Sequence, residues 1–322
     1  MKKIVLSGFQ PSGQIHLGNY LGSLKNFVAL QENYACFFFI ADYHSISENY
    51  EPKEKQRQII DTVRAFLAAG LEPEKSTLYV QSHIPEVFEL AWIFNCLTPI
   101  SYLERMTQYK DKARQQRENV NAGLFDYPVL QAADILLYRA NAVPVGEDQV
   151  QHIELTRQIT RFFNGRFGHY FDEPEALLTK TSRVMSLNDP SKKMSKSLGE
   201  KSYIALTDEP KIIKQKIMSA VTATTGGGRS AGVRNLFLLL KQFSDPKIFM
   251  RFETEEKEGK IKYAELKQQL AKDIAEYFAD FRKKYKTIKD DEVKQVLEKG
   301  AARARPIAKK TLHEVKQKMG LI

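Results

Sequence analysis

The sequence predicts an α/β fold in which a doubly wound parallel sheet is followed by an all-helical C-terminal part. Short apolar runs typical of buried strands alternate with amphipathic helical patterns over the first 190 residues, and beyond Tyr203 only helical patterns occur. Charge follows the same division. Residues 191–322 contain 30 Lys and Arg against 17 Asp and Glu, a net charge of +13, whereas the other 19 and 22 give residues 1–190 a net charge of −3. We therefore expect a domain boundary near residue 190.

Composition narrows the class of protein. The 322 residues are enough for two domains with sizeable cores. Cys36 and Cys96 are the only cysteines and lie far apart, which argues against a disulfide framework and against a zinc or iron–sulfur site. The apolar run at residues 36–40 is too short to cross a bilayer, and the N-terminal Met-Lys-Lys leads directly into a strand pattern. We expect a soluble, cytoplasmic protein that has no membrane partner.

The basic C-terminal part indicates a phosphate-rich polymer as its partner, while the near-neutral part is suited to small-molecule chemistry. Lysine that only aids solubility is the alternative. The clearest helix of this part places its apolar residues on one stripe: Leu266, Leu270, Ile274, Tyr277, Phe278 and Phe281. A later basic cluster consists of Arg303, Arg305, Lys309 and Lys310.

The first predicted unit is a strand, a glycine-rich turn and a helix. Residues 3–6 read as a short buried strand, residues 7–13 as a turn, and residues 15–28 as a helix with leucines three or four apart. In such sheets ligands collect at the carboxyl ends of the strands, where helix N-termini also favour anions. The glycines fit neither G-x-G-x-x-G nor G-x-x-x-x-G-K-[ST], so a dinucleotide-dependent enzyme and a P-loop NTPase are both disfavoured.

Further units extend the predicted sheet. Residues 36–40 form a second buried strand that ends in polar groups including His44, and strands at 77–80 and 143–145 follow. A last strand is expected at 183–187. Alternation of this kind implies parallel strands joined by right-handed crossovers. We also expect a helical insertion in this part of the chain, at about residues 104–170.

Three predicted helices have distinct surfaces. The helix at 52–69 is amphipathic, and residues 104–119 are polar and basic, which predicts a solvent-facing helix. Residues 87–94 are apolar on nearly every side. Such a helix is buried either in the core or against a second subunit, and the pattern does not choose between them.

Three acidic residues, Asp134, Glu147 and Asp148, have both a structural and a functional interpretation. Asp134 stands among apolar helical neighbours, and an unpaired buried carboxylate costs on the order of several kcal/mol, so it needs a partner. An internal donor or a ligand could supply that partner. Glu147 and Asp148 follow Gly146 at the start of a long helix, where acidic residues ordinarily complement the helix dipole. With Gly146 they could instead bind the hydroxyls of a ribose.

A basic loop follows the last predicted strand. Turn-forming residues at 188–190 lead into Lys192, Lys193 and Lys196, which are interleaved with serines. Lysine ammonium groups on a pliable loop suit a polyanion such as a triphosphate. A merely solvated basic turn is the alternative.

Two of these stretches resemble the paired signatures of the class I aminoacyl-tRNA synthetases. Pro11 to Asn19 is similar to the HIGH signature, and Lys193-Met194-Ser195-Lys196-Ser197 matches the KMSKS signature without change. They occur in the right order and about a domain apart. Residues 7–13, 132–138 and 143–149 further resemble the bacterial tryptophanyl-tRNA synthetases within that class.

The resemblance implies a Rossmann-like catalytic domain at 1–190 and a helical domain at 191–322 that carries the KMSKS loop and binds the tRNA anticodon. It implies that the protein is an enzyme, that it forms a homodimer, and that it needs ATP and Mg²⁺. The implied reaction activates L-tryptophan to tryptophanyl-adenylate and transfers the amino acid to tRNA(Trp).

The resemblance also assigns roles to individual residues. Catalysis is implied for His16, Lys193, Ser195 and Lys196. ATP binding is implied for Gln10, Pro11, Ser12, Gly18, Asn19, Gly146, Glu147, Asp148, Val184, Lys193, Met194, Ser195, Lys196 and Ser197. Tryptophan binding is implied for Asp134, Tyr127, His44 and Gln149, and pyrophosphate contact for Lys112. No residue is implied as a metal ligand.

Three positions depart from the family pattern: Gln131 stands where many relatives have Met, Tyr43 where Gln is common, and Leu198 where an acidic residue is usual. Three other activities stay open: a tyrosyl-tRNA synthetase, a non-catalytic relative, and a smaller nucleotidyltransferase. The intact lysines argue against the second, and the basic helical part has no use in the third.

Overall fold

The computed structural model of the chain describes residues 2–322 apart from 12, 48, 111–119, 179–182 and 223–229. The chain forms two compact units. Unit 1 consists of Met1–Gly13, Asn26–Lys180 and Lys289–Ile322, and unit 2 of Gln14–Lys25 and Thr181–Ile288. This division differs from the single boundary expected near residue 190, because an early turn belongs to unit 2 and the last helix packs on unit 1.

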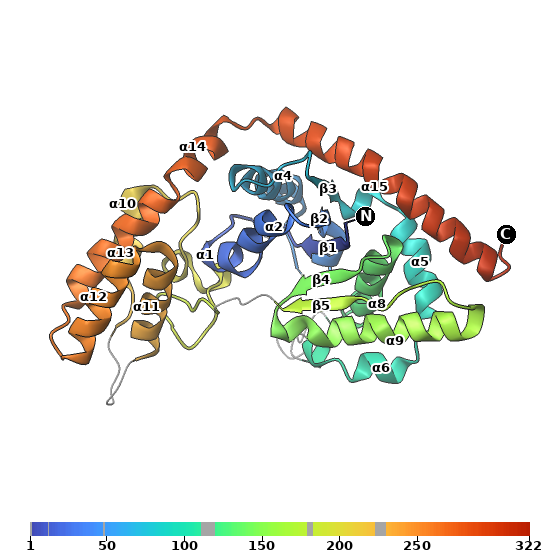
Figure 1. Cartoon of the computed structure of the whole chain (residues 1–322), viewed down its shortest axis with the longest axis horizontal. Coiled ribbons are helices and arrows are strands. Elements are labelled where there is room, and N and C mark those ends of the chain that lie inside the picture. Colours follow the sequence, from blue (N-terminus) through green and yellow to red (C-terminus); the bar gives the residue numbers. More distant parts are fainter. Residues whose placement is uncertain (1, 12, 48, 111–119, 179–182, 223–229) are drawn as a thin grey trace. The chain divides into compact units, whose positions relative to one another are not determined.

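Unit 1 is built on a five-stranded sheet with the order β3-β2-β1-β4-β5, and every strand pair is parallel. The strands are β1 (Ile4–Phe9), β2 (Ala35–Ile40), β3 (Ser76–Val80), β4 (Ala142–Val145) and β5 (Glu175–Leu178). The predicted parallel sheet is confirmed. The chain leaves β1 for β2 and β3 on one side and returns to β4 on the other, so the connections reverse direction between β1 and β4 (Figure 1).

Two expectations about this sheet are wrong. Residues 183–187 do not form its last strand, because Met185 makes only an isolated antiparallel bridge to Lys193 and the fifth strand is Glu175–Leu178. The range 104–170 is not set apart from the sheet as an insertion either, since β4, the strand predicted at 143–145, lies within it and pairs directly with β1.

Helices cover both faces of the sheet. On one face Phe27 of α2 (Lys25–Leu30) stacks on Phe38 of β2, and Phe66 of α4 (Pro52–Ala68) packs edge-on against Phe27. The other face carries a cluster of buried side chains from α5 (Glu86–Asn95), α8 (Ala122–Leu137), α9 (Val150–Phe167) and α15 (Asp290–Lys318). Short elements complete the unit: α3 (Asp42–Ser45), η2 (Gln81–His83), α6 (Ile100–Glu104) and η3 (Glu147–Gln149). Most of the helix expected at 104–119 lies outside the described residues.

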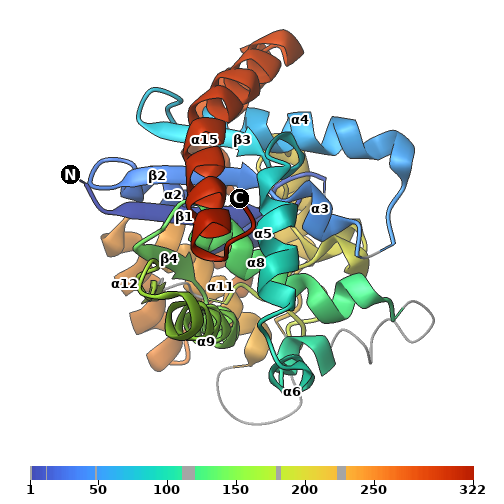
Figure 2. The same cartoon turned by 90° about the vertical axis from the view of Figure 1, so that its right-hand side faces the viewer.

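The last helix packs very closely on β3, as Figures 1 and 2 show. A Cβ added at Gly300 would lie 1.8 Å from the carbonyl oxygen of Leu78, so only glycine permits this approach. Ala304, Ala308 and Leu312 continue the buried stripe of α15. Glycine and alanine thus permit the close approach to β3, and buried apolar side chains such as Leu297, Leu312 and Val315 complete the packing of α15 within unit 1.

Unit 2 is helical, as predicted for the chain beyond Tyr203. Its elements are α1 (Leu17–Asn19), the π-helical η1 (Tyr20–Leu24), η4 (Lys196–Leu198), η5 (Glu200–Ser202), α10 (Pro210–Ser219), α11 (Ala231–Phe243), α12 (Pro246–Lys257), α13 (Tyr263–Tyr277) and α14 (Ala279–Thr287). The predicted stripe from Leu266 to Phe281 is divided between two helices, because α13 ends at Tyr277 and Phe281 belongs to α14. The stripe is buried except at Tyr277, whose hydroxyl hydrogen-bonds that of Tyr20. Among the described helices of the whole chain, none is long and apolar enough to cross a membrane.

Candidate active site

A buried carboxylate network lies in unit 1. Asp134 projects from α8, and its Oδ2 lies 2.8 Å from Nε2 of His44 on α3. Gln81, which directly follows β3, donates from Nε2 to both carboxylate oxygens at 2.9 Å. The Gln81 side chain also accepts the backbone N–H of His44, and Gln81 is 1% exposed. Three elements of the chain thus converge on one carboxylate.

The network resolves the question of how Asp134 is partnered. Burial raises the pKa of Asp134 above its usual range, and the hydrogen bonds from His44 and Gln81 oppose that rise. An internal donor therefore exists, as the structural interpretation requires. A carboxylate has about four acceptor positions, so the three contacts observed leave room for one further donor.

Aromatic and imidazole groups stand beside this carboxylate. The Tyr127 hydroxyl lies 2.9 Å from Nε2 of His152, a buried residue of α9. The Tyr127 ring meets the His44 ring edge-on at 6.3 Å between centroids. Gln149 ends η3, directly before the helix that carries His152. The structure thus brings Tyr127, His44 and Asp134 together.

Another group of predicted residues follows adjacent strands. Gln10 and Pro11 come directly after β1, while Gly146 and Glu147 come after β4. The carboxyl ends of β1 and β4 flank the point where the strand connections reverse, which is where open parallel sheets bind their ligands. The backbone of Asp148 continues this segment. Ser12, Lys112 and the Asp148 side chain lie outside the described residues.

The lysine loop in unit 2 is held in a definite conformation. Val184 and Ser186 exchange backbone hydrogen bonds with the segment that contains Lys193: Met194 N–H donates to Val184 at 3.0 Å, and Ser186 N–H donates to Lys192 at 2.9 Å. Met194 is 2% exposed and anchors the loop. The loop is therefore not the freely solvated turn that composition alone allowed.

Serines shape the second half of the loop. Ser195 caps η4, because its Oγ accepts the Ser197 N–H at 3.3 Å. The fully buried Ser202 places its hydroxyl 2.6 Å from the carbonyl oxygens of Ser195 and Gly199. Sequence reasoning did not single out Ser202.

The His16 turn forms a capping box at the start of α1. The His16 Nδ1 accepts the Asn19 N–H at 3.3 Å, and the Asn19 side chain accepts the His16 N–H at 3.2 Å. Because Nδ1 is an acceptor, the ring proton of neutral His16 resides on Nε2, which is left as a donor.

The turn and the lysine loop meet inside unit 2, although more than 170 residues separate them in the sequence. A Cβ added at Gly18 would lie 3.6 Å from Cβ of Met194. Burial, and then the charges of Lys196 and Lys193, lowers the pKa of His16 to about 4. Burial also lowers the pKa of Lys196 to about 8. At neutral pH the turn presents an uncharged N–H donor beside two ammonium groups, an arrangement suited to a polyphosphate.

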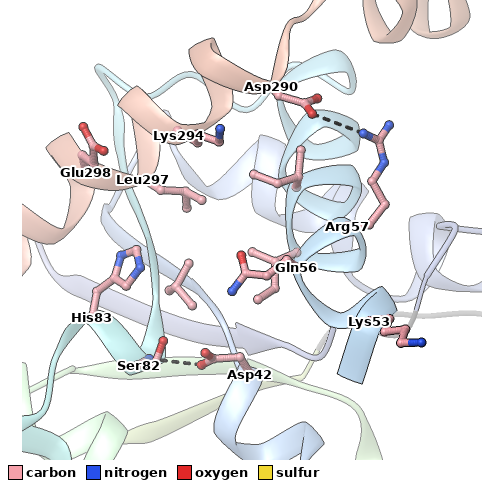
Figure 3. Close-up of a pocket in the computed structure, with 13 residues that line it drawn as sticks. Asp42, Lys53, Gln56, Arg57, Ser82, His83, Asp290, Lys294, Leu297 and Glu298 are labelled. Carbon is pink, nitrogen blue, oxygen red and sulfur yellow. Dashed lines mark hydrogen bonds and ion pairs between the residues drawn. The ribbon is translucent and has the colours of Figure 1, made fainter. Parts of the chain in front are cut away.

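Two further features of the described residues are the lack of a metal-binding group and a pocket outside the predicted site. No group of three or more His, Cys, Asp or Glu side chains there could hold a metal ion. A pocket of about 550 Å³ in unit 1 is lined by α4, α15 and the residues after β3, and Figure 3 shows acidic and basic side chains mixed around it. None of the predicted site residues lines this pocket.

Comparison with known proteins gives one consistent family. The model of the class I tRNA synthetases (W and Y) matches residues 2–279. A tryptophan–tRNA ligase of Caldanaerobacter subterraneus subsp. tengcongensis is 44% identical over 330 residues, covering 99% of this chain and 99% of that protein.

Solved structures agree with this family. A tryptophanyl-tRNA synthetase from Mycoplasma pneumoniae has a TM-score of 0.87 at 33% identity, covering 99% of this chain and 98% of that one. A tryptophanyl-tRNA synthetase from Campylobacter jejuni, complexed with ADP and tryptophan, has a TM-score of 0.86 at 36% identity. The match covers 98% of this chain and 99% of that one. The chain belongs to the class I tRNA synthetases, and within them to the bacterial tryptophanyl-tRNA synthetases.

Proposed function

We propose that the chain is a tryptophan–tRNA ligase, which activates L-tryptophan with ATP and transfers it to tRNA(Trp). The observation that carries this proposal is the close approach of the His16 turn to the intact lysine loop, in a chain that belongs to this family. The tryptophan carboxylate attacks the α-phosphorus of ATP and pyrophosphate leaves. A hydroxyl of the terminal ribose of tRNA then attacks the carbonyl carbon of the adenylate, takes the aminoacyl group and releases AMP.

The lysine loop and His16 are proposed to act on the phosphates. Phosphoryl-type transfer depends mainly on positioning and on neutralising charge, so the protein need not supply a nucleophile. Lys193 and Lys196 bring positive charge, Ser195 orders the loop, and His16 donates from Nε2. Lys112 is proposed to contact pyrophosphate on the resemblance alone.

The Asp134 network is proposed to select tryptophan. The open acceptor position of Asp134 takes the indole N–H, which provides a donor without charge. His44 and Tyr127 supply the neighbouring rings, and Gln149 is assigned to the same substrate. The Campylobacter relative, described with tryptophan and ADP bound, supports this pairing of substrates.

The remaining ATP contacts are proposed from the resemblance and from position. Gln10, Pro11 and the segment Gly146 to Asp148 follow the two strands beside the reversal point, where a ribose fits the ligand-binding edge. Ser12, Gly18, Asn19, Val184, Met194 and Ser197 complete the proposed set. Gly18 and Asn19 belong to the capping box region, and Val184 holds the backbone of Met194.

Mg²⁺ is proposed to enter with ATP. Magnesium usually keeps several waters and binds through one or two carboxylates together with substrate phosphates. The residues described here contain no larger group of metal ligands, which is compatible with an ion carried by the nucleotide.

A homodimer is proposed because helix α5 exposes large aromatic side chains on one side. The Val87, Leu90 and Phe94 side of α5 is buried, but Phe88 is 37% and Trp92 is 70% exposed one turn apart. The ring of Tyr43 contacts Phe88 at 4.5 Å, which extends the apolar surface. Patches of this kind mark interaction sites, and a second copy is the partner that the family predicts.

Unit 2 is proposed to bind tRNA. It contains 23 Lys and Arg against 13 Asp and Glu, so its net charge of +10 equals that of the whole chain. In contrast, Arg303 and Arg305 of α15 contact Glu74 and the His83 carbonyl oxygen within unit 1. Counterion release predicts that tRNA binding depends steeply on salt, while tryptophan activation depends on it much less. A cytoplasmic location follows from this role.

Amino-acid-dependent ATP–pyrophosphate exchange tests the proposed function. Tryptophan should support exchange, and phenylalanine should be rejected by on the order of 10⁴-fold or more because it has no donor for the polar group. Exchange with tyrosine in place of tryptophan would identify a tyrosyl-tRNA synthetase. Absence of exchange with either amino acid would identify a non-catalytic relative.

A further inference from the structure

A buried amide on α11 pairs with the backbone that precedes the lysine loop. Asn235 is 3% exposed, and its carboxamide needs partners because buried polar groups without hydrogen bonds are destabilising. Its Nδ2 donates to the Met185 carbonyl oxygen, and its Oδ1 accepts the Met185 N–H, both at 2.9 Å. The side chain therefore satisfies both backbone groups of a single residue.

Met185 in turn faces Lys193 across an antiparallel bridge. The hydrogen bonds of this bridge come from the neighbouring residues, because Ser186 N–H donates to Lys192 and Met194 N–H donates to Val184. In this arrangement the N–H and C=O of Met185 point away from Lys193. Asn235 receives them, so its amide occupies the place that a third strand would take.

A second contact holds the start of α11 to the same backbone. A Cβ added at Gly232 would lie 2.0 Å from the carbonyl oxygen of Val221. The Val221 N–H donates to the Leu187 carbonyl oxygen at 2.8 Å. Through Val221 and through Asn235, α11 is coupled to residues 185–187 on the side opposite the lysine loop.

We propose that Asn235 is a positioning residue for amino-acid activation: by fixing Met185 it sets the backbone position of Lys193 and makes that position depend on α11. The inference rests on the proposed function, in which Lys193 acts on the phosphates of ATP. Asn235 itself contacts no substrate. A misplacement of about 1 Å in an active site can cost roughly 10²-fold in rate, so a residue behind the loop can control its chemistry.

Two variants of the full chain test this role. Asn235→Leu removes both hydrogen bonds, and Asn235→Asp preserves the shape and the acceptor while it loses the donor to the Met185 carbonyl. In tryptophan-dependent ATP–pyrophosphate exchange we expect kcat/KM for ATP to fall about 10- to 100-fold, with KM for tryptophan unchanged. The aspartate variant provides the result if the leucine variant does not fold.

Leu239→Ala is the matched control, because Leu239 is fully buried on the same helix. It should lower Tm and leave kcat/KM for ATP within about threefold of wild type. In a double-mutant cycle, Asn235→Leu should add little to the loss caused by Lys193→Ala, since both act through one group. Full, multiplicative losses would overturn the proposal.

Amide hydrogen exchange gives a readout that does not require activity. Exchange of the Ser186 and Met194 amides should accelerate in Asn235→Leu and stay unchanged in Leu239→Ala. Unchanged protection in Asn235→Leu would overturn the inference. A wild-type chain without tryptophan-dependent exchange would instead overturn the proposed function, so the two failures are distinct.

Discussion

The Asp134 network and the lysine loop use charge in opposite ways. Around Asp134, donors from two other elements, His44 of α3 and Gln81 of η2, converge on one buried carboxylate and fix its geometry. The lysine loop fixes its backbone through Met185 and Ser202 and gathers positive charge beside His16. A neutral indole needs a preorganised acceptor, whereas a triphosphate needs concentrated positive charge, which is why we propose that the two regions bind different substrates.

The largest effect should come from removing the loop ammonium groups. Lys193→Ala or Lys196→Ala should lower kcat of exchange by roughly 10²- to 10³-fold, because each removes charge stabilisation in the transition state. Lys192→Ala is the matched control, since Lys192 is exposed and pairs with Asp189 at 3.3 Å. A rise in KM for ATP at unchanged kcat would show that the lysines bind the ground state only.

The carboxylate region should respond through the amino acid instead. Gln81→Leu leaves the Asp134 oxygens with fewer donors, and we expect KM for tryptophan to rise by roughly 10- to 100-fold while KM for ATP stays constant. Gln31→Leu is the control, because Gln31 is a buried amide whose described hydrogen bonds go to the Gly70 carbonyl, the Glu72 N–H and the Ser76 hydroxyl, and not to Asp134. That variant should lose stability without a change in either KM.

The support behind the network can be tested at α15. Gly300→Ala forces a methyl group against the Leu78 carbonyl, three residues before Gln81, and should destabilise the fold by about 1–3 kcal/mol. Gly165→Ala is the matched helical control, because nothing lies within 4 Å of the added Cβ. It should be neutral or stabilising by up to about 1 kcal/mol. Equal urea midpoints for the two variants would contradict the close packing of α15.

The smallest effect concerns pH and separates two titratable groups of the loop region, Lys196 and His16. Burial lowers the pKa of Lys196 to about 8, so the free enzyme loses this charge as pH rises through 8. KM for ATP should then increase by up to about tenfold per pH unit, and Lys196→Arg should remove that dependence. The low pKa of His16, about 4, keeps this residue uncharged, so KM for ATP should not change between pH 5 and 7. A transition near pH 6.5 would show that His16 acts as a cation.

Much of unit 1 follows from local sequence, because buried parallel strands and amphipathic helices leave clear periodicities. The fifth strand does not. Glu175–Leu178 is a short edge strand without β-branched residues, whereas the better pattern at 183–187 pairs with the lysine loop. The attachment of α15 was equally hidden, because Gly300, Ala304 and Ala308 carry little hydrophobic signal.

The residues of the candidate sites likewise fall into those that the sequence predicts and those that it does not. Motif spacing located the lysine loop and the His16 turn, and the burial of Asp134 was correctly inferred from its apolar neighbours. The supporting amides were not found. Gln81 follows β3 as His44 follows β2, so its position at a strand end was an available signal. Asn235 gave none, because its partner is the backbone of a residue fifty positions away.

The separate roles of the Asp134 network and the lysine loop are tested most directly by ATP–pyrophosphate exchange. The kinetics are measured for Gln81→Leu, Lys193→Ala and the combined variant. If one region selects tryptophan and the other acts on ATP, the losses in kcat/KM should be additive in free energy within about 0.5 kcal/mol. A coupling energy of about 1 kcal/mol or more, with KM for tryptophan raised by Lys193→Ala alone, would contradict the separate roles.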